Sequence, residues 1–294
     1  MSVWEIIGEH ITAATAKPFA IQRRQNLSGG CINRAYRLQG GNRDYFVKLN
    51  VATKLAMFEA EAAGLEEIAT NSTVKTPRPV CWGRHHEQSY LVLEYLELRS
   101  ASDLTMVSLG KGLAQMHQQP RPYFGWHREN TIGATPQHNG RYQDWASFWR
   151  RHRLGFQLDL AERNGYGDRL SAKGDRLLAG LDALFKDYPV VPALLHGDLW
   201  AGNVASLADG GPVIFDPAVY YGDREADLAM TELFGGFSPC FYDAYRETYP
   251  LHDGYRTRRV LYNLYHVLNH LNLFGGAYLG QTQHMLDKLL AELG

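Results

Sequence analysis

Three side chains in the C-terminal half of the chain have the types and the order that phosphoryl transfer needs. Asn203 stands five residues after Asp198, and a short apolar run, 213–215, ends on Asp216. When a phosphoryl group leaves ATP, one aspartate accepts the proton of the acceptor hydroxyl, while an asparagine and a second aspartate bind Mg²⁺. The pattern therefore predicts Asp198 as the base, and Asn203 and Asp216 as Mg²⁺ ligands.

The spacing Asp-x-x-x-x-Asn is also that of the protein-kinase catalytic loop. Two positions depart from that loop: Gly197 replaces its arginine, and Asp216-Pro217-Ala218 replaces Asp-Phe-Gly. These departures favour kinases of small molecules. The alternative is a loop whose Asp and Asn only cap turns, but here the His-Gly prefix, the spacing and the Ile-Phe-Asp run coincide.

A glycine-containing turn near the N-terminus is a candidate for phosphate binding. Ser28, Gly29 and Gly30 lie between two predicted strands, and glycines let backbone N–H groups approach phosphate oxygens closely. The turn matches neither a Walker sequence nor a complete Gly-x-Gly-x-x-Gly, so a simple turn is the alternative. Cys31 follows directly; we interpret it either as an exposed redox thiol, able to link two subunits, or as an inert packing residue.

Lys48 lies in an apolar strand and is predicted to contact phosphate and to pair with a glutamate of the next helix. The alternative is an outward-facing lysine on an edge strand. Glu59 and Glu61 are the possible partners, and at two positions apart they cannot share a helix face. Glu61 is preferred because it lies on the same side as the apolar Phe58 and Leu65.

The periodicity of the chain predicts a two-lobed α+β protein, with a small β-rich lobe at 1–95 and a large, mainly helical lobe at 96–294. Gly40-Gly41-Asn42 predicts a hairpin turn, and the junction between the lobes is expected near 94–98. Strands are expected at 32–38, 45–49, 80–83, 89–94 and around 212–216. Helices are expected at 3–16, 54–69, 102–118, 142–164, 171–187, 224–234, 239–248, 256–274 and 281–293.

The composition of the chain limits the classes of molecule that it is expected to bind. The 294 residues are 45% hydrophobic and 21% charged, with 30 basic and 31 acidic side chains. This balance predicts no binding to nucleic acid or to an anionic membrane. No apolar run reaches the length of a membrane span, and the start of the chain lacks the features of a signal peptide. Three scattered cysteines predict neither a disulfide framework nor a zinc site, so we expect a cytoplasmic protein.

With these residues in view, the chain resembles the fructosamine (ketosamine) kinase family, which is related to aminoglycoside and choline kinases and has the protein-kinase-like fold. The resemblance covers nearly the whole chain. It is most specific in the runs 195–203 and 214–237, which combine Trp200 with Asp-Pro-Ala-Val-Tyr-Tyr-Gly and Leu-Phe-Gly-Gly-Phe. Asp223 stands where the family often has histidine.

The resemblance implies an ATP- and Mg²⁺-dependent kinase that phosphorylates the third sugar carbon of a ketosamine, free or on a glycated peptide or protein, and so promotes deglycation. It implies that Asp227 supports the catalytic loop and that a hinge binds adenine through backbone groups of Leu93, Glu94, Tyr95 and Leu96. Candidates for the substrate side, each also compatible with a core position, are Trp200, Trp126, Tyr220, Phe234, His266 and His270. A homodimer is possible. Two other readings are a kinase of an aminoglycoside, choline or a free sugar, and a non-catalytic nucleotide-binding protein.

Overall fold

A computed structural model describes residues 1–27 and 32–294, and it divides into two compact units. Unit 1 comprises residues 1–105 and 204–217, and unit 2 comprises 106–203 and 218–294. The sequence predicts a single boundary at 95/96. In the structure the first segment of unit 1 continues to residue 105, and the chain contributes a second segment, 204–217, to unit 1. No helix among the described residues is long and apolar enough to cross a membrane.

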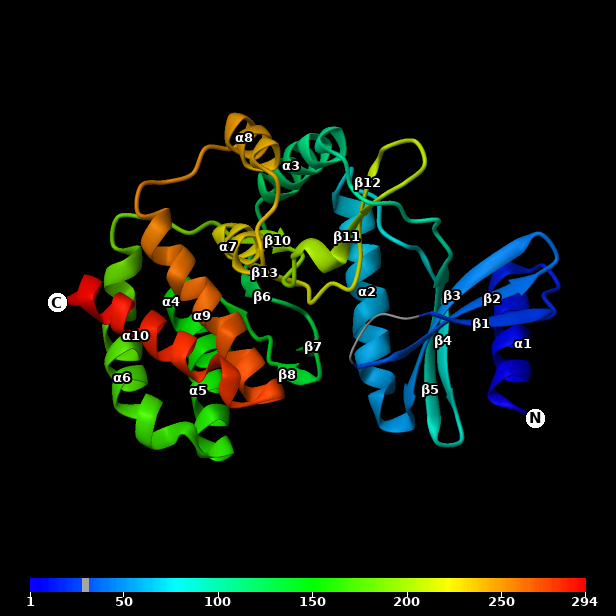
Figure 1. Ribbon diagram of the computed structural model, residues 1–294, viewed down its shortest axis with the longest axis horizontal. Coiled ribbons are helices and arrows are strands. Elements are labelled where there is room, and N and C mark those ends of the chain that lie inside the picture. The colour runs from blue at the N-terminus through cyan, green and yellow to red at the C-terminus, as the bar shows by residue number, and fades with distance from the viewer. Residues whose placement is uncertain (28–31) are drawn as a thin grey trace. The chain divides into compact units, whose positions relative to one another are not determined.

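Unit 1 is built on a five-stranded antiparallel sheet with the order β1-β2-β3-β5-β4. Helices α1 and α2 lie on opposite faces of this sheet (Figure 1). Because side chains alternate along a strand, β3 gives Val47 to the α1 core and Phe46 to the α2 core. The bounds are α1 Val3–Thr15, β1 Arg23–Leu27, β2 Arg34–Gly40, β3 Arg43–Val51, α2 Leu55–Asn71, β4 Pro79–His85 and β5 Gln88–Glu94.

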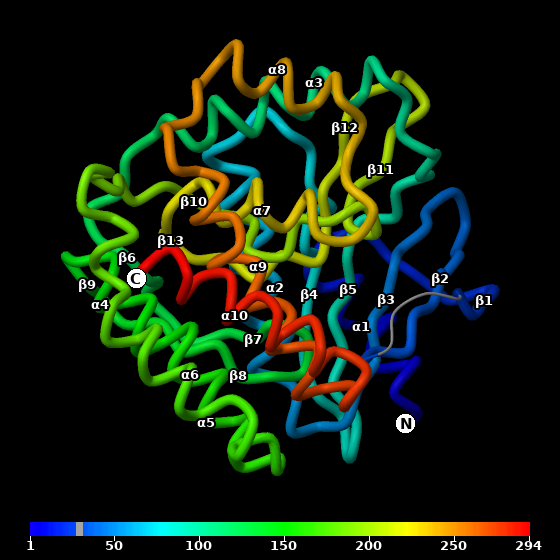
Figure 2. The backbone as a smooth tube through the Cα atoms, turned by 60° about the vertical axis from the view of Figure 1, so that its left-hand side comes forward, coloured from blue at the N-terminus to red at the C-terminus, as the bar shows by residue number. Residues whose placement is uncertain are grey.

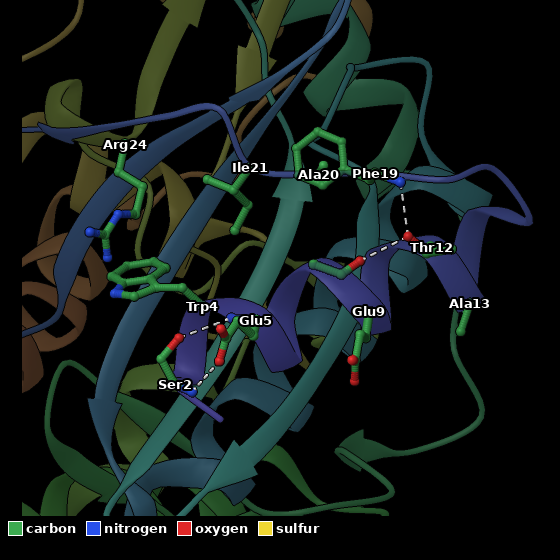
Figure 3. Close-up of a pocket in the computed structure, with 11 residues that line it drawn as sticks. Ser2, Trp4, Glu5, Glu9, Thr12, Ala13, Phe19, Ala20, Ile21 and Arg24 are labelled. Carbon is green, nitrogen blue, oxygen red and sulfur yellow. Dashed lines mark hydrogen bonds between the residues drawn. The ribbon is translucent and has the colours of Figure 1, made fainter.

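The α1 face of unit 1 carries an open groove of about 810 Å³, lined by α1 and the segment 19–24 (Figure 3). The helix begins with a capping box in which Ser2 and Glu5 exchange side-chain and backbone hydrogen bonds. Thr12 accepts a hydrogen bond from the backbone N–H of Phe19 at 2.9 Å, which holds the chain after α1 against the helix. The Arg24 guanidinium lies 4.8 Å from the Trp4 ring centre at the other end of the groove.

The second segment of unit 1 is a small hairpin of β11 (Val204–Ser206) and β12 (Pro212–Ile214). Each strand of this hairpin is hydrogen-bonded to a different segment of unit 1. Ser206 and Arg99 exchange backbone hydrogen bonds at 2.8 and 2.9 Å, and the Ile214 N–H donates to the Lys75 carbonyl at 3.0 Å. The hairpin therefore delivers Asp216, two residues beyond β12, to unit 1.

Unit 2 is mainly helical, with α9 buried along most of its length. Helix α10 packs beside α9 and α6 (Figure 2). Its α-helices and π-helical turns are α3 Asp103–His117, α4 Trp145–Trp149, the π-helical turn Arg150–Gly155, α5 Phe156–Ala161, the π-helical turn Glu162–Tyr166, α6 Gly167–Gly180, α7 Glu225–Leu233, α8 Pro239–Thr248, α9 Tyr255–Phe274 and α10 Leu279–Leu293.

Two small sheets complete unit 2. One has the order β10-β13-β6-β9, and the other is a β7-β8 hairpin. The strands are β6 Phe124–Gly125, β7 Asn130–Ile132, β8 Thr135–Gln137, β9 Arg141–Tyr142, β10 Ala193–Leu195 and β13 Tyr220–Gly222. Each is two or three residues long, too short to show an alternation in sequence, so the periodicity of the chain does not predict them.

The expected α+β class and hairpin at Gly41 are confirmed, since β2 ends at Gly40 and β3 begins at Arg43. The single helix expected over 142–164 is wrong in detail. Two π-helical turns interrupt it, and Gly165, at φ +87°, breaks the helix before α6. A π-turn keeps the apolar pattern of a helix but shifts the face that follows it, so the sequence alone does not show it.

Candidate active site

The buried ammonium group of Lys48 holds together a cluster of charged side chains in unit 1. Its neighbour Val47 belongs to the α1 core, so the Lys48 side chain is directed to the α2 face, where it is only 5% exposed. Lys48 Nζ lies 2.6 Å from Glu61 Oε1 and 2.6 Å from Asp216 Oδ1. The pairing with Glu61 follows the helix-face argument, and the surface-lysine alternative is wrong.

Charge makes this cluster suitable for holding a phosphate and a cation. Burial alone would lower the pKa of Lys48, but the carboxylates of Asp216 and Glu61 outweigh it and raise that pKa. Burial raises the pKa of Glu61, which Lys48 opposes. Lys48 therefore keeps its positive charge at neutral pH.

Asp216 is the more open member of the cluster. Its side chain is 47% exposed, against 10% for Glu61. Its backbone has φ +56°, the left-handed region that Asp tolerates better than most residues. An accessible carboxylate on a constrained backbone has the chemistry of an Mg²⁺ ligand.

Unit 2 carries the proposed base on the turn that follows β10. Gly197 has φ +80°, and a Cβ there would lie 2.1 Å from the Ala218 carbonyl oxygen, so only glycine fits. The Ala218 N–H donates to the His196 carbonyl at 2.8 Å. This close approach explains why glycine stands at the position where protein kinases have arginine.

A buried carboxylate holds the same turn through hydrogen bonds to its backbone. Asp227 in α7 accepts the backbone N–H groups of His196 at 2.7 Å and Gly197 at 2.8 Å. It also lies 3.2 Å from His117 Nε2, and His117 Nδ1 is 2.9 Å from the Tyr245 hydroxyl. Burial would raise the pKa of Asp227, but His117, His196 and the Gly197 amide outweigh it and hold that pKa below its usual value.

Asn203 closes the turn onto Asp198. Asn203 Nδ2 donates to the Asp198 carbonyl oxygen at 2.9 Å and to its carboxylate Oδ2 at 3.3 Å. With the amide nitrogen held in this way, the amide oxygen is the atom left to bind a hard cation, as the Mg²⁺ assignment needs. No group of three or more His, Cys, Asp or Glu side chains among the described residues could hold a metal alone. Mg²⁺ bound here would thus take further oxygens from phosphate and water.

The substrate-side candidates separate into a partly exposed row and a buried set. Ring centres are 6.3 Å apart for Trp200 and Phe234, and 4.8 Å apart for Phe234 and His270. Trp200 is 37% exposed, and the row continues to Phe274 and Tyr278 through His270. Sequence reasoning missed these last two rings.

The remaining three candidates are buried. Trp126, Tyr220 and His266 are 1%, 2% and 4% exposed. Burial lowers the pKa of His266 to about 3, so this imidazole is neutral at physiological pH. Its backbone carbonyl accepts a hydrogen bond from His270 Nδ1 at 2.8 Å.

The expected adenine hinge lies at the end of β5. Leu93 is in the α2 core, and the Glu94 N–H donates to the Arg78 carbonyl at 2.8 Å. Tyr95 lies under the Arg37 guanidinium at 4.2 Å, and Leu96 follows. The predicted phosphate turn, Ser28, Gly29 and Gly30, and Cys31 lie outside the described residues.

A Lys–Glu–Asp cluster around a buried lysine in a β-rich unit and an Asp-x-x-x-x-Asn turn in a helical unit are the characteristic parts of kinases with the protein-kinase-like fold. The chain belongs to the fructosamine kinase family, whose model matches residues 3–292.

Individual relatives agree with this assignment. A Synechocystis protein named probable ketoamine kinase is 49% identical over 98% of this chain and 97% of its own length. A chloroplastic protein-ribulosamine 3-kinase from Arabidopsis thaliana is 41% identical over 94% of this chain and 85% of its own. The crystal structure of a Haemophilus somnus protein provisionally named a fructosamine-3-kinase superposes with a TM-score of 0.90, at 28% identity, over 98% of this chain and 100% of that one.

Proposed function

We propose that this protein is an ATP-dependent kinase that phosphorylates a sugar hydroxyl of ketosamines. The observation that carries the proposal is the contact of the buried Lys48 ammonium with both Glu61 and Asp216, in a chain of the fructosamine kinase family. Lys48 would neutralise phosphate charge while Glu61 holds it in place. In the reaction, Asp198 takes the proton of the acceptor hydroxyl, that oxygen bonds to the γ-phosphorus, and the bond from this phosphorus to ADP breaks.

Magnesium is part of the proposal. Asp216 and Asn203 would hold it, and the bound ion would supply positive charge against the triphosphate oxygens. The side chains of the proposed site contribute to catalysis by positioning the reactants and neutralising charge, and they form no covalent bond with them.

The partly exposed row of rings is the proposed support for the acceptor substrate. Trp200 is two residues from Asp198, so its ring is tied to the residue that receives the proton. Flat apolar rings can pack against the C–H faces of a sugar, and His270 adds a polar edge to the row. Whether Trp126, Tyr220 or His266 also shapes the pocket stays a prediction, as do the adenine hinge at 93–96 and the phosphate turn at 28–30.

Phosphorylation at the third sugar carbon, followed by loss of the adduct from its amine, is the outcome we propose. Relatives carry the names ketoamine kinase and protein-ribulosamine 3-kinase. A glycated peptide or protein as the acceptor, a homodimer and a cytoplasmic location are further parts of the proposal.

The test is ATP consumption with a panel of fructosyl- and ribulosyl-amines, both free and on a peptide, beside free sugars, an aminoglycoside and choline. NMR of the product identifies the phosphorylated carbon. We expect turnover with ketosamines and phosphate on the third sugar carbon. Turnover confined to choline, aminoglycosides or free sugars would replace the proposal with one of those activities, and no turnover with any acceptor would refute catalysis.

A further inference from the structure

A buried arginine in unit 2 has no part in the reaction described above. Arg153 lies in the π-helical turn Arg150–Gly155 and is 0% exposed. Its hydrogen bonds go to uncharged oxygens: Nη1 donates to the backbone carbonyls of His138 at 2.7 Å and His152 at 3.1 Å, and Nη2 donates to Asn139 Oδ1 at 2.7 Å. Its Nε has no hydrogen-bond partner among the described residues. Burying a charge without a carboxylate partner costs stability, so stability alone does not account for this residue.

One chain of hydrogen bonds leads from Arg153 to the segment that follows Asp216. Asn139 Nδ2 donates to Asn130 Oδ1 at 2.8 Å, and Asn130 Nδ2 donates to the Val219 carbonyl at 2.8 Å. Gln137 Nε2 donates to the same Asn130 oxygen at 2.9 Å and to the Ala218 carbonyl at 3.0 Å. The side chains of the β7-β8 hairpin therefore clamp residues 218–219.

The clamped segment bears directly on the turn that carries Asp198. Ala218 donates its N–H to His196, and its carbonyl oxygen occupies the space that a Cβ of Gly197 would need. A displacement of Ala218 therefore displaces the two residues before Asp198. In a close-packed interior such a shift is transmitted rather than absorbed.

A second route runs through an aromatic ring. The Arg153 guanidinium carbon lies 4.1 Å from the Tyr220 ring centre and 4.6 Å from that of Phe148. Tyr220 Cε1 is 3.4 Å from the position of a Cβ on Gly197. The two routes thus meet at Gly197.

From these contacts we propose that Arg153 is a positioning residue, which sets the place of Asp198 through Asn139, Asn130, Gln137 and Tyr220. A guanidinium suits this task because its planar fork holds several acceptors and stacks on rings at once, which an ammonium group does not. The inference rests on the proposed function only for its effect on turnover. Its effect on the 195–203 turn is independent of the substrate.

The variant that tests the proposal is Arg153→Met, with Arg150→Met as the matched control. Arg150 lies in the same π-helical turn, but it donates to the Leu178 carbonyl and to the exposed Asp182 carboxylate. We expect Arg153→Met to lower kcat per folded molecule at least about tenfold, because small misplacements of a reacting group are costly. The KM for ATP should stay within about twofold, and Arg153→Lys should recover little of the loss. Arg150→Met should keep the wild-type kcat.

A double-mutant cycle separates positioning from general damage. If Arg153 acts through Asn139, the double variant Arg153→Met/Asn139→Ala should be about as slow as the slower single variant. Multiplicative losses would overturn the proposed route. If Arg153→Met does not fold, Asn139→Ala and Gln137→Ala carry the test, since each alone should lower kcat at unchanged KM for ATP.

Hydrogen exchange of the backbone amides measures the structural effect of the variant without a phosphoryl-acceptor substrate. In Arg153→Met, the amides of the 195–203 and 218–222 segments should exchange faster than in Arg150→Met, while α6 and α10 keep wild-type protection. Exchange that changes only around residue 153, or uniformly over the chain, with kcat per folded molecule intact, would refute the positioning role. If the wild type phosphorylates no ketosamine but the exchange pattern appears, the proposed function fails and the positioning role stands.

Discussion

Replacing Asp227 with asparagine is the most direct test of how the base-bearing turn is supported. The carboxylate is 1% exposed and accepts two backbone N–H groups, those of His196 and Gly197. Asparagine keeps one acceptor oxygen, but it directs an NH₂ group toward one of these amides. A buried donor left without an acceptor costs about 1–3 kcal/mol, and hydrogen bonds to a charged group are stronger than neutral ones by about 1 kcal/mol.

We therefore expect Asp227→Asn to lower the free energy of unfolding by about 2–4 kcal/mol, the sum of these two effects. For a protein of this size that corresponds to a fall in Tm of roughly 3–6 °C. Calorimetry at pH 7 measures it. The control is Asp182→Asn, which removes an exposed carboxylate paired with Arg150 at 2.6 Å and should cost no more than about 1 kcal/mol.

The pH dependence of the free energy of unfolding, compared between wild type and Asp227→Asn, adds a second check. The pKa of Asp227 is held below its ordinary value of 3.8 in the folded protein. A carboxylate with a lowered pKa contributes stability that is present above its unfolded pKa and is lost as pH falls through the folded one. The gap between wild type and Asp227→Asn should thus be constant from pH 8 to about pH 5 and narrow below about pH 4. A variant as stable as wild type at pH 7, or a gap that widens on acidification, would refute the support assigned to Asp227.

Four further outcomes follow from the site. Asp198→Asn should lower kcat by about 10²–10⁴ with ATP binding kept; more than roughly a tenth of the wild-type rate would exclude a proton acceptor there. Asp216→Ala should raise the Mg²⁺ requirement more than Asn203→Ala, because only the aspartate neutralises metal charge; equal, small shifts in a Mg²⁺ titration would contradict both assignments. Lys48→Met should raise the KM for ATP or lower kcat while circular dichroism stays unchanged, and unaltered ATP kinetics would remove Lys48 from the phosphate site. If Cys31 is a redox thiol, mild peroxide should inactivate wild type and give a dimer band on non-reducing gels, both absent in Cys31→Ala; equal losses without that band would leave Cys31 a packing residue.

The parts that a local pattern encodes were predictable. Glu61 could be chosen over Glu59 because a helix face is determined by spacing alone, and the structure pairs Glu61 with Lys48. The hairpin at Gly41 followed from its turn residues in the same way. The roles of Asp198 and of the 93–96 segment in binding and catalysis stay predictions.

The parts that depend on distant segments were not predictable. The sequence shows an apolar run that ends on Asp216, but not that the chain returns to unit 1 there and meets Lys48, 168 positions earlier. His117 carries no local sign of its contact with Asp227, 110 positions later. The π-helical turn that buries Arg153 looks, in sequence, like ordinary helix.

The sequence by itself therefore determined which residues could do the chemistry, because Asp198, Asn203 and Asp216 are recognised by type and spacing along the chain. Tertiary structure alone decided what holds them in place: Lys48 against Asp216, Asp227 beneath the His196–Gly197 turn, and Ala218 against Gly197. Spacing can reveal the order of chemical groups within a segment. The burial that sets their charge and the contacts that set their positions come from other elements of the fold, from Ala218, 21 positions after Gly197, to Lys48, 168 positions before Asp216, and only folding brings them together.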